Sequence, residues 1–153
     1  MFNLHLTAEQ IEFRDTVNSF ATQEILPSAI DPDRLEPFEK PLIKEWLEKA
    51  SDLGLRTLMI SEVAGGVGAD VMTSCIVLEE LARGDVDIAI ILAQTALLGK
   101  FLVDNWMTKE QIENFLPGFL EDNNFHLAFA GPTSAGLTGW CYHEDFQEEP
   151  GVS

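Results

Sequence analysis

Apolar side chains recur at helical spacing over most of the chain, and capping patterns mark where helices begin. Thr7-Ala8-Glu9-Gln10 is a capping box with Thr7 at the N-cap and Gln10 at N3, and Leu6 and Ile11 occupy the positions of a hydrophobic staple. Because Pro27 lacks the backbone N–H that a helix interior needs, the first helix is predicted over about residues 8–26. Its inward face is expected to contain Phe13, Val17, Phe20 and Ala21.

Two more helices are expected before residue 85. Pro41 suits the first turn of the second helix, and Gly54 is expected to end it. The third helix is predicted to begin after an Asp70 cap and to stop at Gly84. The second helix should bury Leu42, Ile43, Trp46, Leu47 and Ala50. The third should bury Val71, Cys75, Leu78 and Leu81 or Ala82, and turn Glu79, Glu80 and Arg83 outward.

Residues 86–103 are almost entirely apolar, and we expect a buried helix there, in the middle of the bundle. A membrane span is not favoured, because the stretch is at the short limit for one and polar residues interrupt it. The interrupting residues are Asp87, Gln94, Thr95, Gly99 and Lys100. Residues 107–112 repeat the cap and staple of residues 6–11, so a further helix should begin at Thr108, and Pro117 is expected to end or kink it.

The pattern changes after Asn124. Residues 126–130 are predicted to form a short strand that Gly131-Pro132 turns, yet nothing up to Ser153 offers it a partner strand. We therefore expect a sheet domain to follow. The predicted fold is all-α, an orthogonal bundle of about five to six helices over residues 1–124. Residues 125–153 are then the beginning of an incomplete β-domain, starting with its first strand.

The negative net charge of the chain limits the classes of macromolecule that it is expected to bind. The chain has 9 basic and 26 acidic residues, a net charge of −17, and no Lys or Arg after Lys109. Nucleic acid and anionic membrane are therefore not expected as partners. Cys75 and Cys141 are far apart and indicate neither a disulfide framework nor a zinc site, and the N-terminal residues resemble no targeting peptide. We expect a cytoplasmic protein.

Three patterns have both a structural and a chemical interpretation. The glycines of residues 64–70 favour a tight turn before the Asp70 cap, with a ligand-facing turn as the alternative. Glu79-Glu80 favours a solvated or salt-bridged role, because adjacent helical carboxylates point about 100° apart and cannot share a proton. The three histidines, His5, His126 and His143, form no recognisable triad and are expected at the surface or in turns.

Gln94 and Thr95 are the polar exceptions in the middle of the apolar stretch. Core hydrogen bonding is one interpretation of both residues. The other is a pocket wall, because helical spacing puts four residues on one face. These residues are Ile90, Ala93, Gln94 and Leu97.

Several strings, taken together and in this order, resemble the N-terminal domain of acyl-CoA dehydrogenases. They are Leu6-Thr7-Ala8-Glu9-Gln10, Phe13-Arg14-Asp15-Thr16-Val17, Glu24-Ile25-Leu26-Pro27 and Leu53-Gly54-Leu55-Arg56. Residues 61–68 resemble that family's P-E-x-x-G-G-x-G turn, and residues 77–84 follow at the usual distance as V-L-E-E-L-A-R-G. The likeness covers residues 4–130.

The resemblance implies a six-helix N-terminal domain, a β-domain and a C-terminal four-helix bundle, with FAD between subunits and domains. It implies α-proton abstraction from an acyl-CoA thioester by a carboxylate base of the C-terminal domain, while the β-hydride passes to the flavin, giving a 2-enoyl-CoA in fatty acid metabolism. It also implies an electron-transfer flavoprotein or similar acceptor and a homotetramer. No catalytic residue is therefore expected in this chain, which alone should be inactive.

Two parts of the family's site carry over by resemblance. The acyl-pocket wall corresponds to Ile90, Ala93, Gln94 and Leu97. The flavin-contacting strand end, aromatic-x-apolar-Thr-Glu-Pro, corresponds to residues 127–132, where Ala130 replaces the threonine and Gly131 the glutamate. The expected flavin contacts are Phe129, Ala130, Gly131, Thr133 and Ser134. The expected function is part of an FAD-dependent acyl-CoA dehydrogenase, and the alternative is a non-catalytic helical interaction module derived from that domain.

Overall fold

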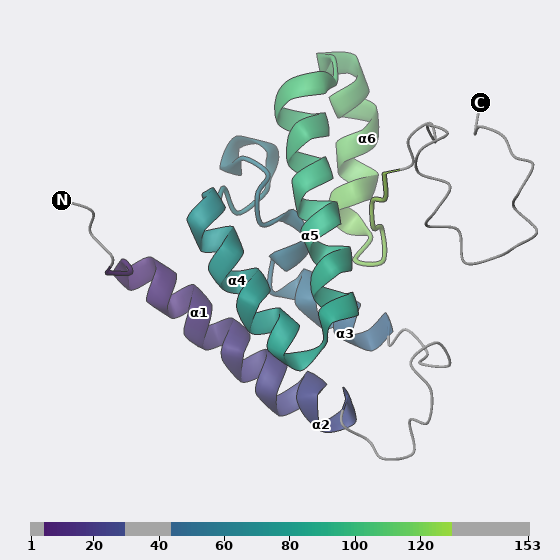
Figure 1. Ribbon diagram of the computed structural model, residues 1–153. Coiled ribbons are helices and arrows are strands. Elements are labelled where there is room, and N and C mark those ends of the chain that lie inside the picture. Colours follow the sequence, from purple (N-terminus) through teal and green to yellow (C-terminus); the bar gives the residue numbers. More distant parts are fainter. Residues whose placement is uncertain (1–4, 30–43, 130–153) are drawn as a thin grey trace, which may run out of the picture.

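The computed structural model describes residues 5–29 and 44–129, and these residues form a helical bundle (Figure 1). The elements in chain order are α1 (Ala8–Phe20), the π-helical turn η1 (Ala21–Ile25), α2 (Leu26–Ala29), α3 (Lys44–Asp52), the 3-10 turns η2 (Leu55–Thr57) and η3 (Glu62–Ala64), α4 (Val71–Gly84), α5 (Val86–Phe101), the π-helical turn η4 (Leu102–Trp106) and α6 (Lys109–Glu121). The prediction of an all-α fold is confirmed.

The first helix begins as predicted and runs further than predicted. Thr7 accepts a hydrogen bond from the backbone N–H of Gln10, and the Gln10 side chain accepts one from Thr7, which completes the capping box. The limit expected at Pro27 is wrong, since α2 continues to Ala29. Leu26 donates its N–H to Ala21, five residues back, so the regular i−4 ladder is already interrupted before the proline ring.

The start and end signals around α3 and α4 are confirmed in part. Trp46, Leu47 and Ala50 are buried on α3, while Leu42 and Ile43 lie outside the described residues. Gly54 follows with a left-handed backbone, φ 79°, as a helix stop requires. Asp70 caps α4 by accepting a hydrogen bond from the N–H of Thr73, and these bonds to backbone and side chain hold the pKa of that carboxyl below its usual range.

The predicted inward face of α4 is wrong by about one residue. Val71, Cys75 and Ala82 are exposed, and of the predicted residues only Leu81 is buried and Leu78 half-buried. The buried residues are Thr73, Ser74, Val77, Leu81 and Gly84. Hydroxyl groups can face inward here because Ser74 donates to the Asp70 carbonyl, which satisfies a polar group that periodicity alone places outside. Gly84 does not end the helix as a left-handed residue; it lies against the Ala21 carbonyl and Ile25, where a side chain would not fit.

The apolar helix α5 is two-sided rather than buried all round. Its inner face packs on α4 and η2, and its buried residues include Ile88, Leu92 and Ala96. Its outer face exposes Ile90, Leu97 and Phe101. Residues 86–106 form one helix long and apolar enough to cross a membrane by length and composition, a property that core helices of soluble proteins share.

The last helix and the segment after it differ from prediction in two respects. Pro117 does not end α6, which continues to Glu121; Pro117 and Glu113 are both exposed, so water can solvate the carbonyl that lacks a partner. The strand predicted at 126–130 is not formed over residues 126–129, and Ala130 lies outside the described residues. A strand needs a neighbouring strand, and side-chain contacts hold this segment instead.

Two apolar clusters support these elements. The larger joins α1, α3, α4 and α5 around Val17, Trp46, Val77 and Leu92. The smaller joins the turn after η2, η4 and α6 through Ile60, Val103 and Phe119. Figure 1 shows α1 beside α4 at one end of the molecule and α6 at the other, so α5 is the element between them.

The glycine turn at residues 65–68 lies directly against the smaller cluster. Gly65 and Gly68 have φ values of 83° and 73°, which confirms the prediction of a tight turn. At Gly66 an added Cβ would lie 2.3 Å from the backbone oxygen of Ile60. Only glycine therefore allows the turn to approach Ile60.

We predict that Gly66→Ala destabilises the domain by about 3 kcal/mol, at the upper end of overpacking costs, because backbone rather than a flexible side chain must move. Gly118→Ala is the matched control, since no atom lies within 4 Å of its added Cβ. It should stabilise α6 by about 0.5–1 kcal/mol. Urea midpoints at an unchanged m-value measure both, and a Gly66→Ala midpoint equal to that of the parent chain would contradict the steric argument.

Candidate functional site

The predicted pocket-wall residues share the outer face of α5. Ile90 and Leu97 are 49% and 43% exposed, Gln94 is exposed and Ala93 is half-buried. The four residues are therefore on one face, as their spacing predicts. The core hydrogen-bonding interpretation is wrong for Gln94, which lies on this exposed face. In the described part of the chain, this surface is a small apolar stripe with one amide in it.

Lys100 is the nearest cation to that stripe, and its contacts are directed elsewhere. Its ammonium donates to the carbonyl of Met59 at 3.3 Å and lies 3.6 Å from the carboxylate of Asp104. Both contacts are with the turn after η2 and with η4. The charge of Lys100 is therefore partly neutralised before it could meet a group bound against Ile90 or Leu97.

Thr95 is fully buried, and the core hydrogen-bonding interpretation is confirmed for it. Its hydroxyl donates to the carbonyl of Ile91 at 2.8 Å and accepts the N–H of Leu127 at 3.1 Å. The Nδ1 atom of His126 lies 3.4 Å from the same oxygen. One hydroxyl thus joins α5 to the last described segment, residues 125–129.

Arg56 holds the other side of that segment. It is 3% exposed, and its guanidinium donates to the carbonyls of Phe119 at 2.6 Å, Leu120 at 3.3 Å and Phe125 at 3.4 Å. The guanidinium carbon also lies 4.5 Å from the centre of the Phe119 ring. Burial lowers the pKa of Arg56, and the Asp122 charge opposes that shift, yet guanidinium stays charged at neutral pH. Arg56 therefore caps the carbonyl end of α6 from inside the domain.

His126 is the perturbed titratable group nearest to this junction. Its Nε2 atom is buried and has no hydrogen-bond partner among the described residues. Burial lowers the pKa of His126, the Arg56 charge lowers it further, and Asp122 opposes the change. The expectation of a surface or turn histidine is wrong for His126, which is half-buried in an irregular segment.

Four of the five predicted flavin-contacting residues lie outside the part of the chain that the structure describes. Phe129 is 74% exposed, at the end of the described chain. Ala130, Gly131, Thr133 and Ser134 lie outside the described residues. The structure therefore places one of the five, an aromatic side chain that is free to stack on a flat ring system.

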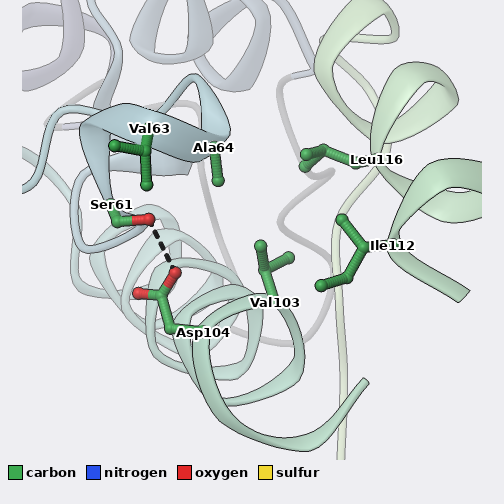
Figure 2. A pocket seen from close by; sticks show the side chains of 7 residues that line it. All are labelled: Ser61, Val63, Ala64, Val103, Asp104, Ile112 and Leu116. Carbon is green, nitrogen blue, oxygen red and sulfur yellow. Dashed lines mark hydrogen bonds between the residues drawn. The ribbon is translucent and has the colours of Figure 1, made fainter. Parts of the chain in front are cut away.

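A separate pocket of about 470 Å³ opens between η3, η4 and α6 (Figure 2). Its lining is mostly apolar, with Val63 and Ala64 facing Ile112 and Leu116. The Ser61 hydroxyl donates to Asp104 at 2.8 Å across it. None of the predicted site residues lines this pocket.

The acidic pair on α4 has a structural role. Glu80 accepts hydrogen bonds from the Asn18 amide at 2.6 Å and from Arg83 at 2.9 Å, and thus ties α4 to α1. Glu79 is exposed and points elsewhere. The predicted structural role is confirmed for Glu80, and within the described residues no group of three or more His, Cys, Asp or Glu could hold a metal ion.

The comparisons with known proteins bear on the whole helical region. Residues 7–123 match the model of the acyl-CoA dehydrogenase N-terminal domain. The chain is 30% identical over 128 residues to an acyl-CoA dehydrogenase of Bacillus subtilis, covering 83% of this chain and 32% of that protein. It is 31% identical over 114 residues to a short-chain specific acyl-CoA dehydrogenase of Clostridium acetobutylicum, covering 74% and 29%, and 35% identical over 98 residues to a benzylmalonyl-CoA dehydrogenase of Aromatoleum aromaticum, covering 63% and 25%.

The helical bundle, the glycine turn and this match define the class of protein as an all-α domain of the acyl-CoA dehydrogenase type. The chain belongs to the acyl-CoA dehydrogenase N-terminal domain family. It spans about a third or less of the length of the curated relatives it matches. The names of those relatives differ in the acyl-CoA they give, so the acyl group does not follow from family membership.

The structural importance of Arg56 was missed in the sequence, although a signal for it exists. Arg56 is the one charged residue in the run Leu55–Ile60, where all six residues are buried. A lone arginine within such a run indicates a buried cation with hydrogen-bond acceptors around it rather than a surface group. The carbonyls that receive it lie more than 60 residues away, so no local pattern identifies them.

We predict that Arg56→Met destabilises the domain by about 2–3 kcal/mol, because the carbonyls of Phe119 and Leu120 lose charged donors. Arg56→Lys keeps the charge without the planar fork and should recover only part of this loss. Amide exchange in the last turn of α6 and urea unfolding measure the effect. Wild-type protection of that turn in Arg56→Met would show that the guanidinium is not its cap.

Proposed function

We propose that this chain supplies one wall of the acyl and flavin pocket of an FAD-dependent acyl-CoA dehydrogenase that oxidises an acyl-CoA thioester to the 2-enoyl-CoA. Membership of the family supports the class of enzyme. We assign residues 1–124 to the helical domain and residues 125–153 to the beginning of the β-domain that follows. The chain's share of its relatives' length agrees with that division of the protein.

The observation that carries the proposal is the outer face of α5. Ile90 and Leu97 are exposed and Ala93 between them is half-buried, and the three form an apolar stripe. Exposed apolar side chains in a row are typical of binding surfaces. An acyl chain is a ligand of matching chemistry, because it needs apolar walls and no hydrogen bonds. Residues 86–99 contain no Lys or Arg, and Lys100 is engaged with Asp104.

The cofactor part of the proposal rests on the segment that follows α6 and is bonded to α5 through Thr95. FAD, when bound, accepts the hydride that leaves the substrate β-carbon. Phe129 is exposed and suited to contact a flat ring, and we assign Ala130, Gly131, Thr133 and Ser134 to the same contact. No carboxylate of this chain is assigned as the base, so proton abstraction falls to another part of the enzyme. We further propose a cytoplasmic homotetramer that passes electrons to an electron-transfer flavoprotein or similar acceptor.

We predict that the complete enzyme prefers an uncharged acyl chain to a dicarboxylate, because a second carboxylate against this wall would have no cation to neutralise it. Dye-linked turnover with butyryl-CoA or a longer homologue should exceed turnover with glutaryl-CoA.

Ala93→Trp should raise the KM for the preferred acyl-CoA about tenfold, because the larger side chain would occupy space beside the wall; this change corresponds to about 1.4 kcal/mol. Glu79→Gln, on the exposed side of α4, is the control. Faster glutaryl-CoA turnover would overturn the assignment of the wall.

We predict that the 153-residue chain alone neither holds FAD tightly nor oxidises acyl-CoA. Flavin needs walls on both faces and donors at its pyrophosphate, whereas residues 110–153 contain no Lys or Arg. A positioned base, worth about 10²–10⁴-fold in rate, is missing as well. Titration with FAD should leave flavin fluorescence unchanged, and dye reduction should not depend on acyl-CoA. A yellow, stoichiometric complex with turnover would refute this division of labour.

The alternative function is a non-catalytic helical interaction module, for which the same exposed face of α5 is the specific observation. The nucleotide sequence downstream of codon 153 separates the two. A reading frame that continues into strands and a second bundle supports the enzyme. A stop codon at that position favours the module.

A further inference from the structure

At the junction between α5 and residues 125–129, the Thr95 hydroxyl has a partner for each of its hydrogen-bonding positions, whereas the His126 imidazole has one ring nitrogen without a partner among the described residues. The Thr95 hydroxyl has one proton and two lone pairs. The proton goes to the Ile91 carbonyl, and the N–H of Leu127 takes one lone pair. The remaining lone pair can receive only a donor, so Nδ1 of His126, at 3.4 Å, is the atom that carries the ring proton.

That arrangement leaves Nε2 of His126 as a bare acceptor. It is buried, and no described residue donates to it or accepts from it. Protonation of the ring would therefore create a buried N–H without a partner and a second positive charge close to Arg56. The neutral ring is therefore favoured over the protonated ring in this position.

The charged groups around the ring come from three elements. Arg56 on η2 opposes a charged imidazole, and Asp122, after α6, favours it. On α3, Glu48 accepts from the Asn124 amide at 2.9 Å and Asp52 from the Asn123 amide at 2.6 Å, so both carboxylates are engaged with the same loop. Thr95 on α5 is neutral. The nearest cation is buried and fixed by three carbonyls, and it cannot move away.

We propose that Thr95 and His126 form a proton-controlled latch that fixes residues 125–129 on α5, closed with neutral imidazole and opened when the ring is protonated. This inference rests on the proposed function for its consequence. Thr95 adjoins the acyl-wall residue Gln94, and Leu127 is two residues from the flavin contact Phe129. The latch thus sets the position of the flavin-facing segment relative to the acyl-facing helix, and both residues are positioning residues.

The direction of the pH effect follows from the pKa of His126. Burial and Arg56 lower that pKa in the closed state, whereas the ring in the open segment titrates at the ordinary value of about 6.5. The open segment then binds the proton more readily than the closed one. The latch is at full strength above about pH 6.5 and weakens as the pH falls below that value.

The test is a titration of the full 153-residue chain by NMR. In a His5→Gln, His143→Gln variant, His126 should titrate below about pH 6.5. The exchange protection factor of the Leu127 amide, corrected for intrinsic exchange, should fall by up to tenfold per pH unit below the ordinary pKa. The protection of Val17 in α1 should not change over the same range.

Two pairs of variants make the test specific. His126→Asn keeps a donor toward Thr95 and removes the titration, so protection of Leu127 should become independent of pH. Thr95→Val removes the acceptor and should abolish that protection at every pH, whereas Thr95→Ser should retain it. Asp122→Asn should lower the pKa of His126 further.

An ordinary pKa for His126 with flat protection of Leu127, or an unchanged pH dependence in His126→Asn, would overturn the latch. None of these measurements uses flavin or acyl-CoA. Failure of the longer protein to bind FAD would therefore refute the proposed function and leave the titration result as it is.

Discussion

A buried guanidinium is tolerated only where carbonyl oxygens converge on it, and this constraint organises one end of the domain. Arg56 emerges from a buried turn and meets the last carbonyls of α6 and that of Phe125. The helix end receives donors and the two terminal nitrogens of the guanidinium receive acceptors, while Nε of Arg56 is buried without a partner among the described residues. The position of α6, the path of residues 122–127 and the approach of Leu127 to Thr95 all depend on that meeting.

The core and the site place different demands on α5. Its inner residues pack against α4, whereas Ile90 and Leu97 on the outer stripe remain 49% and 43% exposed. An apolar helix face that a domain leaves exposed is typical of a binding surface. Under the function proposed above, an acyl chain is the group that would cover this face, because it needs apolar walls and no hydrogen bonds.

The helix starts could be predicted because neighbouring residues decide them. The burial of Arg56 and the path of residues 126–129 could not, because contacts with residues far away in the sequence decide them. The caps at Thr7, Asp70 and Thr108 and the stop at Gly54 are decided by a few neighbouring residues, and all four are confirmed. The inward face of α4 was misjudged because hydroxyl groups there bond to their own helix. The strand predicted at residues 126–130 is not formed over residues 126–129, where no described segment pairs with the backbone and the Thr95 hydroxyl accepts the N–H of Leu127 instead. The burial of Arg56 was decided by carbonyls more than 60 residues away.

The π-helical turn η4 has a consequence for comparing this chain with others. Met107 donates to Leu102, five residues back, and the wider turn brings the rings of Phe101 and Trp106 into a stack at 5.4 Å. A turn of this kind holds about one residue more than an α-helical turn, and one residue corresponds to about 100° around an α-helix. Aligning residues 103–106 without a gap to a relative that has a plain α-helix there would pair core positions with surface ones.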